Sequence, residues 1–294
     1  MRAELLVDSR CELGEGSVWD AGRARLWWTD IDGRAVWRFD PATRETERFT
    51  PPDRVGFLAM CASGKVLLGC AKALYLADIA AGALTATKIA DVEADLATTR
   101  VNDGRADRAG NVVFGTLDEQ HPRTPIASFY QYSSVHGLRR LELPRCRVSN
   151  SITFSPDGRK MYFTDTPTNV IRYGDYDAGA AAVTGIRDLV TLGPRDGHPD
   201  GSIVDADGCL WNAAWGGSAV RRFTPGGHLD RVVEMPAKNP TCPAFGGVDL
   251  STMYVTSSRQ QHTPEELAAA PDAGGVFAVR VPGVRGVADT MFLD

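Results

Sequence analysis

The sequence predicts an all-β protein, a six-bladed β-propeller with four-stranded blades that is closed by an N-terminal strand. Helical periodicity is nearly absent, and short runs rich in Val, Ile, Phe, Trp and Tyr are separated by Asp-Gly, Pro-Asp-Gly and Gly-Gly turns. These runs recur as a unit at intervals of roughly 40–50 residues, which is the period of propeller blades. A β-sandwich would also contain many strands, but it would not show this repetition.

Each unit contains an apolar strand, an Asp/Gly turn, a strand that ends in aromatic or small residues, a short turn, and a strand with an Arg or a Tyr. Four units are clear and two, the second and the sixth, are looser. In chain order the units contain residues 17–40, 56–78, 105–116, 152–173, 203–223 and 245–279.

The two ends of the chain complete this pattern. We expect a strand near Leu5-Leu6-Val7 to complete the final blade, so that the ring closes and no sheet edge is left open. The only helical signal is at 263–270, where Thr263 is a suitable N-cap and Pro264 suits the first helical position. Residues 1–294 are therefore expected to form a single propeller domain.

Composition and charge exclude several classes of partner. The net charge of -5 offers no attraction for nucleic acid or for an anionic membrane. The six cysteines form no CxxC pair, which argues against a zinc ribbon and favours a reducing compartment. No apolar run approaches the roughly 18 residues of a membrane span, and none at the N-terminus is long enough for a signal peptide. We therefore expect a cytoplasmic protein, either a monomer or a weakly associating homo-oligomer.

Four residues with oxygen-bearing side chains precede the Asp/Gly turn of their own unit by about five to eight residues: Glu15, Asn102, Asn150 and Asp200. The innermost strand of each blade lines the central channel of a propeller, so equivalent positions in four blades are expected to surround the axis at one end. Two carboxylates and two amide carbonyls suit Ca²⁺, Mg²⁺ or Mn²⁺. Taken singly, each residue is more simply explained as a turn or capping residue; the shared position favours a metal site. The corresponding positions of the second and sixth units hold Gly, Phe or Ala, which would leave those sides open to a ligand.

Nucleophilic catalysis has less support. The chain contains no G-x-S-x-G elbow and no H-E-x-x-H helix. His198 lies near Asp200 in the sequence, but no serine has the context that a catalytic triad would need.

Six motifs lie in order along nearly the whole chain. They are Leu13-Gly14-Glu15-Gly16 with Trp19, Arg100-x-Asn102-Asp103-Gly104, Asn150-Ser151 followed by Ser155-Pro156-Asp157-Gly158, Pro199-Asp200-Gly201, Phe245-Gly246-Gly247 with Met253-Tyr254-Val255-Thr256, and Ala273-Gly274-Gly275-Val276-Phe277. In these motifs the chain resembles the SMP-30/gluconolactonase/LRE family. This resemblance implies a six-bladed propeller that hydrolyses a sugar lactone with one divalent metal ion, Ca²⁺ first and Zn²⁺, Mg²⁺, Mn²⁺ or Fe²⁺ as alternatives.

The resemblance also implies residue roles. The family's metal ligands correspond to Glu15, Asn150 and Asp200, and its substrate-binding arginine and asparagine correspond to Arg100 and Asn102. The position of a substrate-binding glutamate falls on Gln120, with Glu119 one residue earlier, so either Glu119 or Gln120 is expected to contact substrate. The following Pro-rich segment, 121–126, is expected to form a lid.

The resulting hypothesis is metal-assisted hydrolysis of an aldonolactone to an aldonate. Asp200 would serve as both metal ligand and general base, while Arg100 and Asn102 hold sugar hydroxyls and help to stabilise the oxyanion. One alternative is a non-enzymatic propeller that binds a ligand or partner around a structural metal. Another is an esterase that acts on a non-sugar ester. The identity of the sugar stays open at this level.

Overall fold

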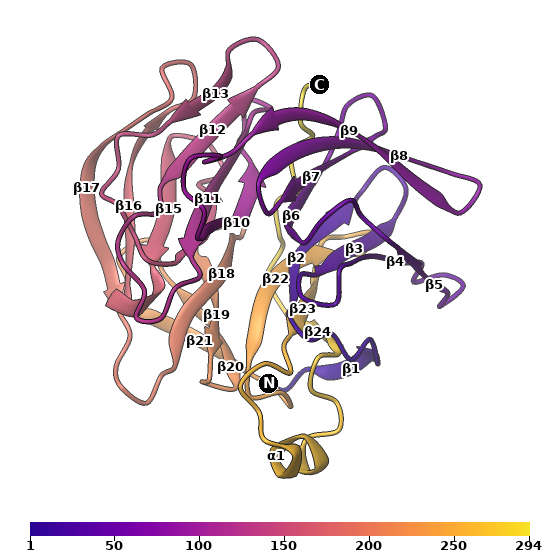
Figure 1. Cartoon of the computed structure of the whole chain (residues 1–294). Coiled ribbons are helices and arrows are strands. Elements are labelled where there is room, and N and C mark those ends of the chain that lie inside the picture. Colours follow the sequence, from indigo (N-terminus) through magenta and orange to yellow (C-terminus); the bar gives the residue numbers. More distant parts are fainter.

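The computed structural model describes residues 1–294 and confirms the predicted six-bladed, all-β propeller (Figure 1). Six antiparallel sheets of four strands each surround a common axis, and in five of the blades neighbouring strands follow one another in the chain. The first three blades are β2 (Gly14–Asp20), β3 (Arg25–Asp30), β4 (Ala35–Phe39) and β5 (Thr46–Phe49); β6 (Val55–Met60), β7 (Val66–Cys70), β8 (Ala73–Ala80) and β9 (Ala83–Asp91); and β10 (Thr99–Ala106), β11 (Val112–Asp118), β12 (Phe129–Ser133) and β13 (Gly137–Arg140).

The last three blades follow the same plan. They are β14 (Ser149–Phe154), β15 (Lys160–Asp165), β16 (Val170–Asp177) and β17 (Ala182–Thr191); β18 (His198–Val204), β19 (Leu210–Trp215), β20 (Ala219–Phe223) and β21 (Leu229–Glu234); and β22 (Pro240–Gly246), β23 (Thr252–Ser257) and β24 (Val276–Arg280) with β1 (Glu4–Val7). A 3-10 helix, η1 (Thr166–Thr168), connects β15 to β16.

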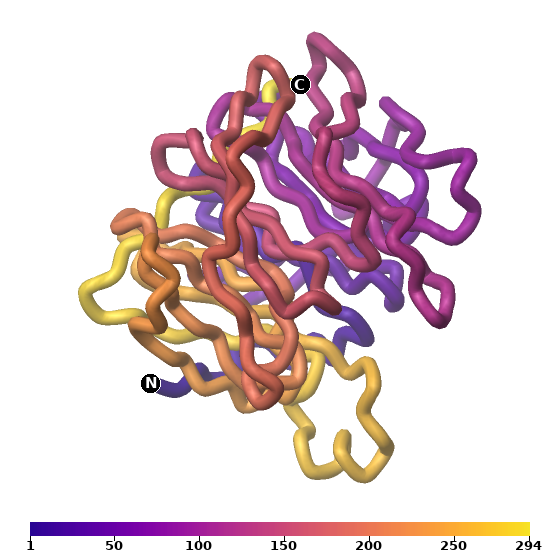
Figure 2. The backbone as a smooth tube through the Cα atoms, turned by 90° about the vertical axis from the view of Figure 1, so that its left-hand side faces the viewer, coloured from indigo at the N-terminus to yellow at the C-terminus, as the bar shows by residue number.

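The N-terminal strand closes the ring, as predicted. β1 pairs with β24 at the outer edge of the sixth blade, with Leu5 opposite Phe277. In Figure 2 the indigo N-terminus lies beside orange strands, consistent with the bridge between Arg2 and Glu234 of the fifth blade. Because β1 and the rest of its blade come from opposite ends of the chain, this pairing joins the first and last blades.

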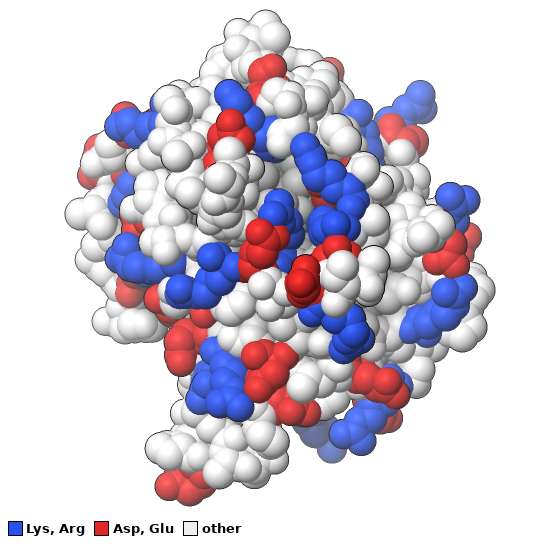
Figure 3. All heavy atoms as spheres, turned by 90° about the vertical axis from the view of Figure 1, so that its right-hand side faces the viewer, with Lys and Arg blue, Asp and Glu red and all other residues white.

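The single α-helix, α1 (Pro264–Ala269), lies in the connection between β23 and β24. Thr263 caps it and Glu266 closes a capping box, which confirms the predicted N-terminus. No helix of the structure has the length and apolar character needed to cross a bilayer. On the face drawn in Figure 3, acidic and basic side chains are interspersed.

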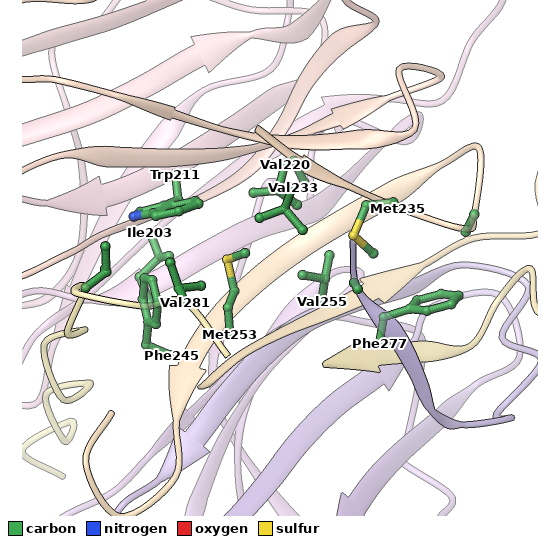
Figure 4. Close-up of a cluster of buried hydrophobic side chains, with 14 residues drawn as sticks. Ile203, Trp211, Val220, Val233, Met235, Phe245, Met253, Val255, Phe277 and Val281 are labelled. Carbon is green, nitrogen blue, oxygen red and sulfur yellow. The ribbon is translucent and has the colours of Figure 1, made fainter. Parts of the chain in front are cut away.

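The core consists of apolar clusters packed between adjacent blades. In the largest, Trp211 and Ile203 of the fifth blade pack against Phe245 and Met253 of the sixth (Figure 4). The rings of Trp211 and Phe245 meet edge to face with centroids 5.8 Å apart. Burying each such side chain contributes about 1.5–3 kcal/mol, so the blades are held to one another mainly by these faces.

The segment after β24 crosses the end of the propeller where the innermost strands finish. Gly286 bridges Asp205, which follows β18, and Phe292 bridges Cys61, which follows β6. The carboxylate of Asp289 pairs with the buried Arg105 near the end of β10. This C-terminal segment therefore ties three blades together at the end opposite the beginnings of the innermost strands.

Candidate active site

Five of the predicted site residues line one cavity of about 320 Å³. They come from four innermost strands: Glu15 from β2, Arg100 and Asn102 from β10, Asn150 from β14, and Asp200 from β18. All five lie near the beginnings of these strands, so the cavity is at one end of the central channel. A concave site with a few convergent polar groups is where a small ligand is expected to bind.

Each innermost strand contains a β-bulge near its beginning, and the bulge sets the direction of these side chains. The observed positions differ from the predicted ones. Glu15 and Asn150 are the last regularly paired residues before their bulges. Asn102 and Asp200 lie one residue further along, within theirs. The prediction that all four share one strand position was therefore wrong by one residue for Asn102 and Asp200. Within a bulge two residues lie opposite one on the neighbouring strand, so the regular alternation of side chains no longer tells which residue faces the channel.

The two remaining blades also differ from the sequence reading. In the second blade the bulge position is Gly56, as predicted. In the sixth blade it holds Thr241 and Cys242 rather than Phe or Ala, because the innermost strand begins five residues earlier than the apolar motif at Phe245 suggested. The hydroxyl of Thr241 donates to the carbonyl of Gly14 and so links the sixth blade to the first.

Two buried carboxylates face this cavity without a basic partner. Glu15 is 9% exposed and Asp200 is 5% exposed, and neither side chain belongs to an ion pair. Burial, followed by the nearby carboxylate of Asp103, raises the pKa of Glu15. Burial, followed by the charges of Glu15 and Asp103, raises the pKa of Asp200 well above its usual value. The arrangement concentrates negative charge that a bound cation would neutralise.

A chain of hydrogen bonds fixes the polar side chains between these carboxylates. Arg100 Nη1 donates to Asn102 Oδ1 at 2.8 Å, and Asn102 Nδ2 donates to Asn150 Oδ1 at 3.0 Å. Asn150 Nδ2 then donates to the hydroxyl of Thr166 at 2.9 Å, which donates to the carbonyl of Pro199. This chain joins three blades and orients both amides. Sequence reasoning missed Thr166, whose only signal was its place directly after a strand that pairs with β14.

The backbone of Asp200 is held as firmly. Its carbonyl accepts hydrogen bonds from Ser151 Oγ at 2.6 Å and from Asn212 Nδ2 at 3.1 Å. Asn212 is fully buried on β19 and also donates to Ser151 Oγ and Ser202 Oγ. Sequence reasoning missed Asn212 because it lies on the second strand of its blade, away from every motif.

The structure does not bring Glu119 or Gln120 into the cavity wall. The carboxylate of Glu119 accepts hydrogen bonds from both terminal nitrogens of Arg54, at 2.7 and 2.8 Å, and lies 3.4 Å from Arg100 Nε. The hydrogen bonds from Arg54 lower the pKa of Glu119. Gln120 is exposed. Glu119 is thus placed to orient Arg100, and the prediction that Glu119 or Gln120 contacts substrate stays a prediction.

The segment between β11 and β12 is organised by Asp118. This carboxylate accepts hydrogen bonds from the N–H and the hydroxyl of Thr124, both at 2.8 Å, and from Gln120 N at 3.1 Å. Burial acts to raise the pKa of Asp118, but these bonds lower it to about 2, so it remains ionised at neutral pH. Within 121–126, the predicted lid, Arg123 is the residue that reaches the cavity. Sequence reasoning gave Arg123 no role.

Replacing Asp118 with alanine is expected to loosen this lid. The three hydrogen bonds to its carboxylate are lost, and each typically contributes about 0.5–1.5 kcal/mol. We expect faster amide hydrogen exchange across 119–126 and a KM raised about tenfold, since ordering the lid must then accompany binding. Asp157→Ala is a matched control, because Asp157 caps a turn of the fourth blade in the same manner. Unchanged exchange and unchanged KM in Asp118→Ala would contradict the role of lid anchor.

Comparison with known proteins gives consistent results. The family model of the SMP-30/Gluconolactonase/LRE-like region matches residues 13–259. L-arabinolactonase of Azospirillum brasilense is 41% identical over 281 residues, covering 95% of this chain and 92% of that protein. The 6-deoxy-6-sulfogluconolactonase of Pseudomonas putida is 35% identical, covering 95% of this chain and 94% of that protein.

A solved structure has the same fold throughout. Regucalcin of Agrobacterium tumefaciens, described as a calcium-binding protein, superposes with a TM-score of 0.90 at 31% sequence identity. The match covers 99% of this chain and 97% of that one. The similarity therefore extends over all six blades.

Proposed function

The chain belongs to the SMP-30/Gluconolactonase/LRE-like family, and from this premise we propose that it hydrolyses a sugar lactone to the open-chain sugar acid with one divalent metal ion. Two relatives that match over nearly the whole chain are named sugar lactonases. The observation that carries the proposal is the pair of buried, unpaired carboxylates in a cavity that also presents a guanidinium and two oriented amides.

The residues present fit a divalent cation with oxygen ligands. Glu15 and Asp200 supply two carboxylates, and Asn150 presents an amide oxygen that accepts only one hydrogen bond. No group of three His, Cys, Asp or Glu side chains in the structure is placed to hold a metal ion, so the amide of Asn150 is needed as the third ligand in this assignment. A hard cation such as Ca²⁺, Mg²⁺ or Mn²⁺ suits such a set. The family resemblance and the calcium-binding regucalcin relative favour Ca²⁺.

The side chains of the chain itself divide the remaining tasks. Asn102 and Arg100 lie side by side on the wall. Both N–H groups of Asn102 donate within the protein, to Ser149 O and Asn150 Oδ1, so Asn102 orients Arg100, whose Nη2 is the donor that can hold a hydroxyl of the lactone ring. The guanidinium of Arg100 keeps its charge at neutral pH, although burial lowers its pKa to about 10. Such fixed donors stabilise the negative charge that develops on the carbonyl oxygen during hydrolysis.

Hydrolysis adds water across the ring ester bond. When bound, the cation would polarise the lactone carbonyl and make water more acidic. The carboxylate of Asp200 accepts a proton from the attacking water while the water oxygen bonds to the carbonyl carbon. The bond from that carbon to the ring oxygen breaks, and the proton passes to the departing oxygen, which becomes a hydroxyl. The immediate product is the aldonic acid, which loses its carboxyl proton to solvent at neutral pH and becomes the aldonate.

The test is acid release from a panel of aldonolactones, including L-arabinono-, D-galactono- and D-gluconolactone. The protein is first stripped of metal and then supplied with Ca²⁺, Mg²⁺, Mn²⁺, Zn²⁺ or Fe²⁺. We expect turnover that depends on metal and is confined to one or a few lactones. Absence of turnover with every lactone and every metal would overturn the proposal and favour a ligand-binding role for the same cavity.

A further inference from the structure

Arg123 brings to the cavity a guanidinium that forms no ion pair with any carboxylate of the protein. It is half-buried, lines the cavity from the lid, and forms no ion pair. Its Nη1 donates to the carbonyl of Asp118, a neutral acceptor, and no other hydrogen bond is made by its guanidinium. The nitrogens Nε and Nη2 are therefore available to a ligand.

The charged groups around Arg123 are already engaged with one another. The carboxylate of Glu119 is held by both terminal nitrogens of Arg54 and lies beside Arg100. Asp32 lies 3.9 Å from Arg54. The carboxylate of Asp118 is occupied by Thr124 and Gln120. The carboxylates of Glu119, Asp32 and Asp118 are thus engaged by other groups, and Arg123 is the guanidinium on the lid side that has no carboxylate in ion-pair contact.

The opposite wall does not balance this charge once a metal is present. Glu15 and Asp200 are the carboxylates that line the cavity, and together they neutralise one divalent ion. An arginine that lacks a protein partner in a partly buried cavity suits an anionic group, because its planar fork binds carboxylate, sulfonate or phosphate through two parallel hydrogen bonds.

We propose that Arg123 is a specificity-determining residue that binds an anionic substituent of the lactone, carried on the part of the substrate that lies against the lid. This inference rests on the proposed function and adds the substrate class, a sugar lactone with an acidic group beyond the ring ester. Glu119 acts in this arrangement as the partner of Arg54 and Arg100, which leaves Arg123 as the donor that the lid presents to substrate.

A matched pair of substrates tests the inference. D-Glucaro-1,4-lactone carries a carboxylate where D-glucono-1,4-lactone carries a hydroxymethyl group. We expect the wild-type protein to prefer the first. Arg123→Gln should lower kcat/KM for glucarolactone by about 10- to 100-fold, mainly through KM, which is the loss expected for a hydrogen bond to a charged group. The same substitution should change kcat/KM for gluconolactone by less than about threefold. Arg123→Lys should recover part of the loss, since it keeps the charge without the fork.

The controls separate this inference from the proposed function. Arg195→Gln removes one positive charge from an exposed arginine outside the cavity lining and should change neither substrate. Equal losses on both lactones in Arg123→Gln, or no loss on either, would overturn the inference while leaving the lactonase in place. If the wild-type protein hydrolyses no lactone, the proposed function fails, and calorimetric binding of glucarate against gluconate still decides the role of Arg123. Tighter binding of glucarate that Arg123→Gln abolishes supports it, and equal binding refutes it.

Discussion

Replacing Asp200 with alanine is expected to lower kcat/KM for the lactone by about 10³-fold or more, the range seen when a general base is removed. The loss should be larger if the carboxylate is also a metal ligand. The fold should persist, because the structure anchors this residue through its backbone carbonyl, which accepts hydrogen bonds from Ser151 and Asn212 and survives the substitution. In metal-free protein the variant should melt at the same temperature as the wild type or higher, since a buried carboxylate with a raised pKa has been removed.

Activity and melting temperature, measured on the same preparations, check this expectation. Asp188→Ala is the matched control, because Asp188 lies on β17 at the outer edge of the fourth blade with its side chain 64% exposed. That variant should keep full activity. An Asp200→Ala protein that retains more than about a tenth of wild-type activity would remove Asp200 from the mechanism.

Removing the metal is expected to make the stability of the protein strongly dependent on pH. The folded-state pKa values of Glu15 and Asp200 are raised, so their unfavourable charges are absent below the ordinary carboxyl range near pH 4. As the pH rises from there through the raised values, both groups ionise against each other and stability falls. A bound divalent ion should cancel this loss, because it prefers the ionised carboxylates and binds only the folded protein.

The measurement is the melting temperature in EDTA and in excess Ca²⁺ at pH 5 and at pH 8. At a calcium concentration of 100 times Kd the folded state gains about 2.7 kcal/mol. For a protein of 294 residues such a gain corresponds to roughly 4 °C. The difference should be larger at pH 8, and a Glu15→Gln, Asp200→Asn double variant should lose it. Equal melting temperatures with and without Ca²⁺ at pH 8 would contradict the metal site.

Much of the architecture could be predicted because it repeats. A propeller blade is a local unit whose strands follow one another in the chain, so its turns and apolar runs appear in sequence order. Even the pairing between the two ends of the chain followed from the need to cover the open edge near Leu5. The register of the site did not follow, because the sequence does not show that Asn102 and Asp200 lie within the bulges of their strands, whereas Glu15 and Asn150 lie just before theirs.

The propeller, its closure at β1, and the oxygen-bearing residues Glu15, Asn102, Asn150 and Asp200 that line one cavity could all be read from the order of residues in the chain. Which side chains near the cavity are free to bind a ligand depends on contacts between blades. Glu119 has the right chemistry to contact a sugar, yet Arg54, from a different blade, occupies both its oxygens. Arg123 faces the cavity because hydrogen bonds to Asp118 fold the lid around it. Contacts between residues distant in the chain depend on packing in three dimensions, and local sequence patterns carry no record of them.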